Sequence, residues 1–231
     1  MFLGGQKMYN LNNDVDVSST RKRSVIDTSK YRCPNVIDLR DFCLPTNNQG
    51  NTPHCVGYTV AGFLEVHNWM NTHVPIQFNA EKLYEYGRKY KTDSMSGTRL
   101  EYVLGQLKSE NIISGSYIRV DPLNIKYFIH QYGVLMGAFY VTDEWYSLSR
   151  KYIIKEKKNP KKLGGHCVLC CGYCPDGLYI QNSWGYEKWG NYGFAVVPWN
   201  LVGKQLSYAI CINNLKMINI TELFYEEQRG S

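Results

Sequence analysis

The spacing of apolar residues changes part-way along the chain, and this change limits the fold more than any other feature. Before Gly133 apolar residues recur at helical spacing, whereas after it they lie in short runs typical of strands. Helices are expected over residues 55–70, 79–90, 98–109 and 122–132, and strands over VLMGAFYV, HCVLCCGY, LYIQNSW, YGFAVV and SYAICIN. A helical first half followed by a strand-rich second half predicts an α+β protein with two lobes.

The chain of 231 residues is long enough for one large domain or for two lobes that share a cleft. Residues 1–32 are polar and are expected to form a flexible extension. The folded part is expected over 33–213, with a helical lobe at about 50–120 and a β-rich lobe at about 121–213. Residues 214–231 are assigned to a C-terminal tail.

The overall composition is that of an ordinary globular protein. Hydrophobic residues make up 44% of the chain and charged residues 20%, both near the averages for folded proteins. The chain lacks an apolar run of about eighteen residues, so we expect no transmembrane helix and no membrane partner. Its first residues do not have the basic and apolar regions of a secretory signal. These features favour an intracellular protein, cytoplasmic or, if viral, associated with the virion.

The net charge of +6 is mild, and part of it comes from the Lys-rich segment 151–162. A groove that binds nucleic acid would combine such lysines with interleaved aromatic side chains or with one helical face. This segment has neither pattern. A solvated loop accounts for it, and no nucleic-acid partner is expected.

The eight cysteines are expected to be free thiols. Cys170 and Cys171 are adjacent, an awkward geometry for two separate bridges, and a protein without a secretory signal is expected in a reducing compartment. The spacing Cys167-x-x-Cys170 and Cys171-x-x-Cys174 resembles a zinc or iron–sulfur ligand set. On a strand, residues three apart point to opposite faces, so small side chains filling a β core are favoured. We expect no metal and no cofactor, with metal binding by this cluster as the alternative.

Cys55 is the candidate nucleophile. A cysteine reacts as a thiolate, and a helix N-terminus and a nearby imidazolium both lower the pKa of a thiol. Cys55 opens the helix expected over 55–70. Acyl transfer also requires hydrogen-bond donors for the developing oxyanion. Gln49, six residues upstream, can supply a side-chain amide beside the Cys55 backbone N–H.

The base for this thiol must be one of five histidines. His54 is the sequence neighbour, but adjacent side chains at a helix start diverge by about 100°, so they rarely align for proton transfer. A loop-filling or surface role is expected for His54. His67 and His73 lie six residues apart and share no helical face. His130 is expected to pack within an amphipathic helix.

His166 is the preferred base because of its surroundings in the sequence. It follows two glycines, which allow close approach, and it opens the strand HCVLCCGY. Sixteen residues later, after a short turn, the strand LYIQNSW presents Asn182. Neighbouring strands can place the two side chains together, so that the Asn182 oxygen accepts the imidazole N–H and orients the ring.

These motifs together resemble those of the papain family of cysteine peptidases. The matching stretches are Gln49-Gly50, Cys55 at a helix start, Gly165-His166 opening a strand, Asn182-Ser183-Trp184-Gly185, Trp189-Gly190 and Tyr192-Gly193. The segment VIDLRDF is similar to the start of the mature domain in that family. The resemblance covers residues 34 to 213.

The resemblance implies a two-lobed papain-like fold, with a helical N-terminal lobe, an antiparallel β-rich C-terminal lobe and an active site in the cleft between them. It implies a thiol endopeptidase in which Cys55 is the nucleophile, His166 the base and then the acid, and Asn182 the orienting residue. Gln49 would help to form the oxyanion hole, and Trp184 would shield the Asn182–His166 hydrogen bond from water. The substrate would be a polypeptide bound in extended form, and the enzyme is expected to be a monomer.

The same resemblance implies substrate-binding positions, and here the chain departs from the family. The glycine pair that contacts the substrate backbone is at best Ser96-Gly97. The second subsite would be walled by Gly137 and Cys167, with a floor near Asn213. The family's cysteine three residues before the nucleophile is replaced by Thr52, and the aromatic residue after the nucleophile by Val56. These changes indicate a divergent member.

Two functional questions stay open at this level. Residues 1–32 are too short and polar to form the family's helical propeptide, and they could be an inert tail or a small plug removed at the triplet RKR (21–23). The fold could also serve as a weakly active or inactive binding protein, or act on another acyl substrate, because a fold does not determine a function.

Overall fold

The computed structural model describes residues 31–89, 97–148 and 152–225. Nearly all of the expected N-terminal extension, the RKR triplet and Ser96 lie outside these ranges. Within the described residues, none of the helices is both long enough and apolar enough to span a bilayer.

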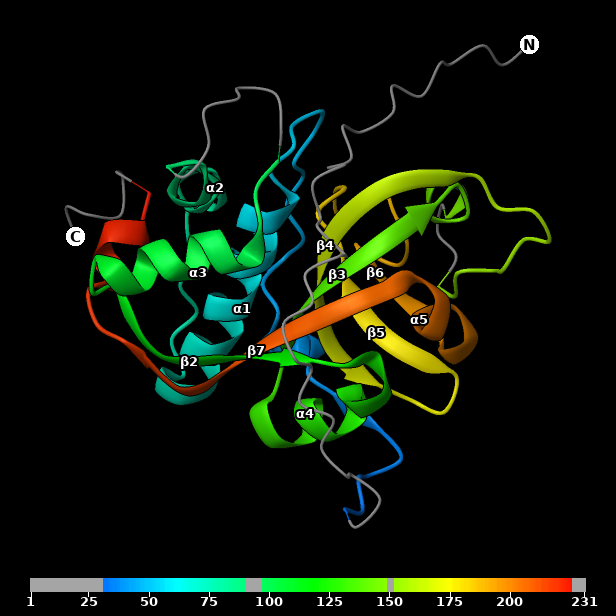
Figure 1. Cartoon of the computed structure of the whole chain (residues 1–231), viewed down its shortest axis with the longest axis horizontal. Coiled ribbons are helices and arrows are strands. Elements are labelled where there is room, and N and C mark those ends of the chain that lie inside the picture. Colours follow the sequence, from blue (N-terminus) through cyan, green and yellow to red (C-terminus); the bar gives the residue numbers. More distant parts are fainter. Residues whose placement is uncertain (1–30, 90–96, 149–151, 226–231) are drawn as a thin grey trace.

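Three helices form one side of the molecule (Figure 1). They are α1 (Cys55–Thr72), α2 (Ala80–Arg88) and α3 (Leu100–Ser109). Helix α1 is buried on most of its circumference, as expected for a helix that other elements cover on several sides. Gly57 allows its close contact with α2, because a Cβ there would lie 2.1 Å from the Ala80 carbonyl oxygen. Asn79 caps α2 by accepting a 3.0 Å hydrogen bond from the Lys82 backbone N–H.

The other side is built on one antiparallel sheet with the strand order β2-β7-β3-β4-β5-β6 and a short β1 paired to β4. Its strands are β1 (Ile37–Asp38), β2 (Ile113–Val120), β3 (Leu135–Thr142), β4 (Lys162–Tyr173), β5 (Gly177–Gln181), β6 (Phe194–Pro198) and β7 (Leu206–Met217). Helices α4 (Ile125–Tyr132) and α5 (Trp199–Gln205) pack against it. Short 3-10 helices lie at Arg40–Phe42, Pro122–Asn124, Trp145–Ser147 and Ile220–Leu223.

Each face of the sheet has its own hydrophobic core. Along β4, Cys167, Leu169 and Cys171 pack with α1, whereas Val168 and Cys170 pack in the core on the opposite face. This alternation is the period-two pattern of a strand buried on both sides. Strand β4 is therefore held firmly on both faces and forms a rigid support for the residues that it carries.

Strand β7 connects the two lobes. Its first half pairs with β3, and its second half pairs with β2, which lies beside the helices (Figure 1). The residues assigned to a tail continue this strand to Met217 and then form the Ile220–Leu223 helix. Leu223 is fully buried, and its carbonyl oxygen accepts a 2.8 Å hydrogen bond from the Asn79 backbone N–H. The chain is therefore part of the fold at least as far as Leu223.

The α+β class is confirmed, and the four expected helices and five expected strands are present within a few residues. Among the longer described elements, β2 and α5 were not expected. Strand β2 contains Gly115 and two serines and alternates poorly, so its apolar pattern is weak. Its register comes from pairing with β7 rather than from its own sequence.

Candidate active site

Cys55 is the first residue of α1, and its side chain is only 1% exposed. The Cys55 thiol has a pKa well below its ordinary value. The largest cause is a hydrogen bond from the Cys167 thiol, and a hydrogen bond and charge attraction from His166 act in the same direction. Burial opposes them by disfavouring the charged form. Its place at a helix N-terminus, where the dipole favours negative charge, also suits a thiolate.

His166 lies near the start of β4 and is completely buried. Its Nε2 is 2.7 Å from the Asn182 side-chain oxygen. That oxygen also accepts a 2.8 Å hydrogen bond from the Ser183 backbone N–H, which helps to hold the Asn182 amide in this orientation. An acceptor at Nε2 holds the proton of the neutral ring there and leaves Nδ1 to interact with the Cys55 thiol.

The sheet register explains why Asn182 meets His166 although sixteen residues separate them. Strands β4 and β5 are antiparallel neighbours, with Leu169 opposite Gln181. Asn182 follows directly after the last residue of β5, and its backbone N–H donates a 2.9 Å hydrogen bond to the Gly193 carbonyl oxygen. The side chain is thus held at the strand end, beside the start of the neighbouring strand.

Aromatic rings enclose this pair. The Trp184 ring stacks on His166 with centroids 4.7 Å apart and an interplanar angle of 27°. Trp145 meets His166 edge-on at 6.4 Å, and its indole N–H donates a 2.8 Å hydrogen bond to Gln205. Sequence analysis did not identify Trp145, because no motif surrounds it. A buried, low-dielectric setting strengthens the His166–Asn182 hydrogen bond.

Gln49 is 3% exposed, and hydrogen bonds hold both its side chain and its backbone. Its side-chain oxygen accepts from the Ser183 hydroxyl at 2.5 Å, and its backbone N–H donates to the Ser183 carbonyl oxygen at 2.8 Å. Its side-chain nitrogen donates to the Thr52 carbonyl oxygen at 2.8 Å. An amide nitrogen has two protons, so a second donor is left for a ligand. Ser183 was part of the sequence motif, but its tie to Gln49 was not expected.

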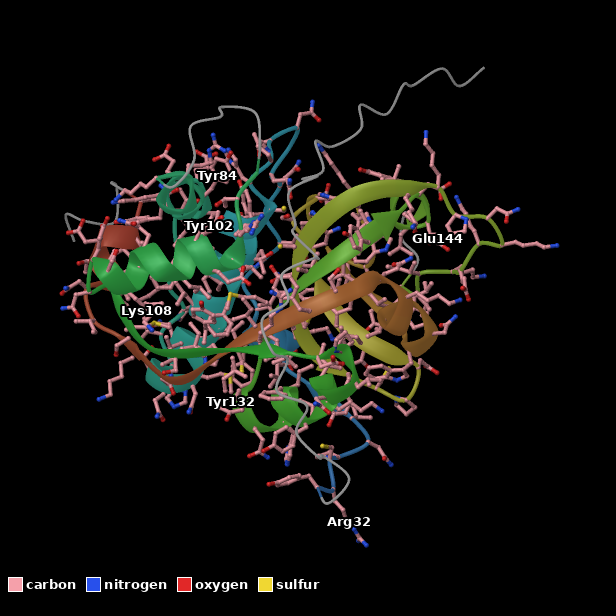
Figure 2. All side chains as sticks on the ribbon, in the orientation of Figure 1. Arg32, Tyr84, Tyr102, Lys108, Tyr132 and Glu144 are labelled. Carbon is pink, nitrogen blue, oxygen red and sulfur yellow. The ribbon has the colours of Figure 1, made fainter. Side chains whose placement is uncertain are left out.

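The other four histidines do not lie where they could act as the base for the Cys55 thiol. His54 caps α1 and packs against Tyr84 of α2, with ring centroids 4.0 Å apart; Tyr84 is labelled in Figure 2. His67 is partly buried beside Phe63, and desolvation of its ring lowers its pKa to about 4, so it is neutral near pH 7. His73 ends α1 in a left-handed conformation. His130 is exposed, so the expectation that it packs within its helix was wrong.

The predicted substrate-binding positions are only partly brought together. Cys167 lies beside Cys55, but the side-chain direction of Gly137 faces the far core, where a Cβ would lie 2.6 Å from the Cys170 sulfur. The residue opposite Cys167 on β3 is Ala138, and Ala138 packs in the core on the α1 side of the sheet. Gly97 is buried shortly before α3.

Asn213 is also remote from Cys167. It pairs with Ser116 of β2, whereas the β7 residue opposite Ala138 is Tyr208, five positions earlier. Five strand residues span about 16 Å, so Asn213 cannot form the floor beside Cys167. The expectation placed the floor too far along β7, beyond the point where the strand leaves the β-rich lobe.

A charged network lies at the position that Asn213 was expected to occupy. The Tyr208 hydroxyl donates a 3.2 Å hydrogen bond to the Glu101 carboxylate. Arg119 forms an ion pair with the same carboxylate at 3.6 Å, and its guanidinium lies 3.8 Å from the centroid of the Tyr208 ring. The Glu101 charge reaches Cys167, where it contributes to a raised pKa of that thiol after the larger effects of Cys55 and burial. The sequence contains no motif for this network.

The cysteine cluster has the arrangement expected of core side chains. Cys167 and Cys170 point to opposite faces of β4, into different cores. All eight cysteines lie in described segments and none forms a disulfide there. Among the described residues, no group of three or more His, Cys, Asp or Glu side chains is arranged to hold a metal ion.

Solved structures with the same architecture identify the fold. Xylellain, a cysteine protease from Xylella fastidiosa, aligns over 92% of this chain and 99% of its own, with a TM-score of 0.75 and 18% identity. The fold is that of the papain-like cysteine proteases. Digestive procathepsin L 3 from Tenebrio molitor larval midgut aligns over 88% of this chain and 76% of its own, with a TM-score of 0.68 and 16% identity.

A third papain-like neighbour comprises the cysteine protease and lectin-like domains of Cwp84, a surface layer associated protein of Clostridium difficile. It aligns over 81% of this chain and 53% of its own, with a TM-score of 0.65 and 15% identity. No family model and no curated protein sequence matches the chain. The papain-like fold is therefore present here in a sequence that is at most 18% identical to these three structures.

Proposed function

We propose that the protein is a thiol endopeptidase that hydrolyses polypeptides through Cys55, His166 and Asn182. The observation that carries this proposal is the arrangement of His166 between two partners. Asn182 holds one ring nitrogen at 2.7 Å, and His166 lowers the pKa of the Cys55 thiol on its other side. A thiolate–imidazolium pair held by an orienting amide is the arrangement that nucleophilic acyl transfer requires.

The first half of the reaction forms an acyl-enzyme. The Cys55 sulfur attacks the carbonyl carbon of the scissile peptide bond, and the carbonyl oxygen becomes an oxyanion. The Cys55 backbone N–H and the remaining Gln49 side-chain N–H stabilise that charge. The imidazolium of His166 then gives its proton to the leaving amine, the C–N bond breaks, and the thioester is left on Cys55.

The second half releases the enzyme. Neutral His166 accepts a proton from a water molecule, which attacks the thioester carbonyl through a second tetrahedral intermediate. The C–S bond breaks, the acid product leaves, and the proton returns the pair to its starting state. Asn182 keeps the ring orientation through both halves, and Trp184 and Trp145 exclude water from its hydrogen bond.

Labelling with an epoxide-type inhibitor of thiol peptidases tests the proposal. The purified protein is expected to gain one inhibitor mass at Cys55, together with cleavage of an unstructured protein substrate. Cys55→Ala should lose both, while Cys211→Ala, which removes a buried thiol in the other core, should retain both. Unlabelled Cys55 in folded wild-type protein would contradict a peptidase function and favour a binding protein.

A further inference from the structure

Cys167 is a second thiol beside the nucleophile, and the proposed reaction does not use it. It follows His166 directly on β4, is 2% exposed and packs in the same hydrophobic core as Cys55. Its thiol is in hydrogen-bond contact with the Cys55 thiol, and its backbone N–H donates to the Cys55 sulfur as well. Two cysteine sulfurs therefore lie side by side in a site whose chemistry needs one.

The packing of β4 on α1 holds these two sulfurs together. Cys167, Leu169 and Cys171 share the face of β4 that packs with α1. The two elements approach closely at Gly62, where a Cβ would lie 3.4 Å from the Leu169 side chain. Cys55 opens the same helix, and Cys167 precedes Leu169 by two residues on the same strand face. Both thiols are thus carried by regular elements, and a disulfide of about 2 Å would form by a further approach of side chains that are already in contact.

The two thiols differ in the way that a peroxide-sensitive pair requires. The pKa of Cys55 is well below its ordinary value, whereas that of Cys167 is well above it, because of its hydrogen bond to Cys55, its burial and the Cys55 charge. The pair therefore holds its negative charge on Cys55 and its proton on Cys167. Peroxides attack low-pKa thiolates, and a neighbouring cysteine then resolves the sulfenic acid that forms. A substrate carbonyl must reach the Cys55 sulfur in the proposed function, and hydrogen peroxide is smaller than any peptide.

We propose that Cys55 and Cys167 form a reversible disulfide when a peroxide oxidises the nucleophile. The Cys55 thiolate attacks one oxygen of hydrogen peroxide, the O–O bond breaks, and Cys55 becomes a sulfenic acid. The departing hydroxide takes the proton of the His166 imidazolium and leaves as water. The Cys167 sulfur then attacks the Cys55 sulfur, the S–O bond breaks, and the second hydroxide leaves as water with the Cys167 proton. One peroxide is reduced to two water molecules, and the two cysteines together lose two electrons.

The disulfide keeps the nucleophile in a form that a thiol reductant can restore. A sulfenic acid that meets no second thiol is oxidised further to a sulfinic acid, which thiols do not reduce. Cys167 thus protects Cys55 from permanent oxidation while the site is switched off. The accompanying loss of activity rests on the proposed peptidase function, whereas disulfide formation depends only on the contact between the two thiols.

Peptide mapping after peroxide treatment tests the proposal. The reduced full chain is treated with hydrogen peroxide, remaining thiols are blocked with iodoacetamide, and the digest is analysed by mass spectrometry. The wild type should yield a linked pair of peptides that contain Cys55 and Cys167, whereas Cys167→Ala should carry two added oxygen atoms on Cys55. Cys171→Ala is the matched control and should keep the link, because Cys171 lies on the same face of β4 but its thiol contacts Cys43.

Recovery with dithiothreitol gives a second measurement. The wild type and Cys171→Ala should regain most of their initial rate of peptide cleavage, and Cys167→Ala should regain at least roughly tenfold less. Oxidised Cys55 beside a free Cys167 thiol in folded wild type would overturn the proposal, as would equal recovery in wild type and Cys167→Ala. A wild type that cleaves no peptide would contradict the peptidase function instead, and the peptide map would still decide the disulfide.

Discussion

The Ser183 hydroxyl donates a 2.5 Å hydrogen bond to the Gln49 side-chain oxygen, and this bond joins the two lobes at the active site. Gln49 belongs to the loop that leads into α1, and Ser183 follows the orienting Asn182. A second bond, from the Gln49 backbone N–H to the Ser183 carbonyl oxygen, links the same two residues. Gln49, the proposed oxyanion donor, is therefore positioned by the loop that carries Asn182, the proposed third member of the triad.

Ser183→Ala should release the Gln49 side chain while the backbone bond keeps the loop in place. We expect kcat/KM to fall on the order of tenfold, chiefly through kcat, because a mobile oxyanion donor stabilises the transition state less than a fixed one. Steady-state kinetics on a fluorogenic peptide measures this. The control is Ser116→Ala on the exposed face of β2, which should behave as wild type. Equal activity in both variants would show that Gln49 is held without Ser183.

The two histidines nearest to the nucleophile, one in sequence and one in space, should respond differently to removal. His166→Ala is expected to abolish cleavage, a loss of at least about a thousandfold, because the base and the ion pair disappear together. His54→Ala should retain most activity, since its ring packs on Tyr84 rather than serving the thiol. Thermal melting checks that both variants fold. Loss of activity in folded His54→Ala would contradict this assignment.

Cys167→Ala should change the pH at which Cys55 becomes reactive. The hydrogen bond from the Cys167 thiol is the largest cause of the lowered Cys55 pKa, so its loss should move that pKa upward. The rate of alkylation by iodoacetamide, measured against pH, should therefore rise at a higher pH in the variant than in the wild type. An unchanged profile would mean that His166 and the helix dipole alone set the pKa.

Glu65→Gln should remove a pH-dependent loss of stability. Burial raises the pKa of Glu65 from 4.5 to about 7, so the folded state holds a proton that the unfolded state releases between these values. Stability from this group is full below pH 4.5 and is lost by pH 7, a change of about 3 kcal/mol. Glutamine keeps the acceptor that the Phe78 N–H uses at 3.0 Å. The unfolding free energy of Glu65→Gln relative to wild type should thus rise between pH 4.5 and 7.

His67 makes the comparison with wild type necessary, because it acts in the opposite direction. Burial lowers its pKa from 6.5 to about 4, so its contribution to stability is present above pH 6.5 and is lost as the pH falls through 4. Urea denaturation of wild type and Glu65→Gln at several pH values separates the two groups. If the difference in unfolding free energy between the two proteins does not change with pH, Glu65 has the same pKa in the folded and unfolded states.

Arg119→Met should alter the side-chain preference of the proposed peptidase. Arg119 pairs with Glu101 at 3.6 Å beside the Tyr208 ring, and the Glu101 charge acts on Cys167. Methionine keeps apolar packing on the Tyr208 ring but leaves the Glu101 carboxylate uncompensated. We expect substrates with Lys or Arg at the second position before the cleaved bond to gain about tenfold in kcat/KM relative to Leu, or ~1.4 kcal/mol. A peptide library compared between variant and wild type measures the gain, and the double variant Arg119→Met/Glu101→Gln should abolish it.

The residues that the sequence located well are those whose roles depend on local context. Cys55 opens a helix, and Asn182 directly follows a strand that neighbours the one carrying His166. Apolar periodicity and a short turn between the two strands were therefore enough to predict these placements. The positions that failed depend on register over long separations. Gly137 and Ala138 are adjacent, and only the pairing of β3 with β4 decides which faces α1. Asn213 was misplaced because the β7 residue opposite Ala138 is Tyr208, five positions earlier, and only the pairing of β3 with β7 shows this.

Other features of the site have no signal in a single sequence. The ion pair of Glu101 and Arg119 joins α3 to β2, and the latter strand was not expected at all. Trp145 reaches His166 because its indole is held by Gln205, sixty residues later. The bridge between Gln49 and Ser183 spans 134 positions. These contacts follow from the tertiary fold and become visible only once the strands are placed.

The course of β7 limits how far the two halves of the fold can form separately. This strand follows β2 and β3 in the sequence, yet it pairs with β3 in one lobe and with β2 in the other. Without it, β3 lacks one neighbour and β2 lacks its neighbour in the described sheet. Cys55 and His166 lie on elements that precede β7, so we expect the site that they form to be completed only when the strand that ends at Met217 is in place.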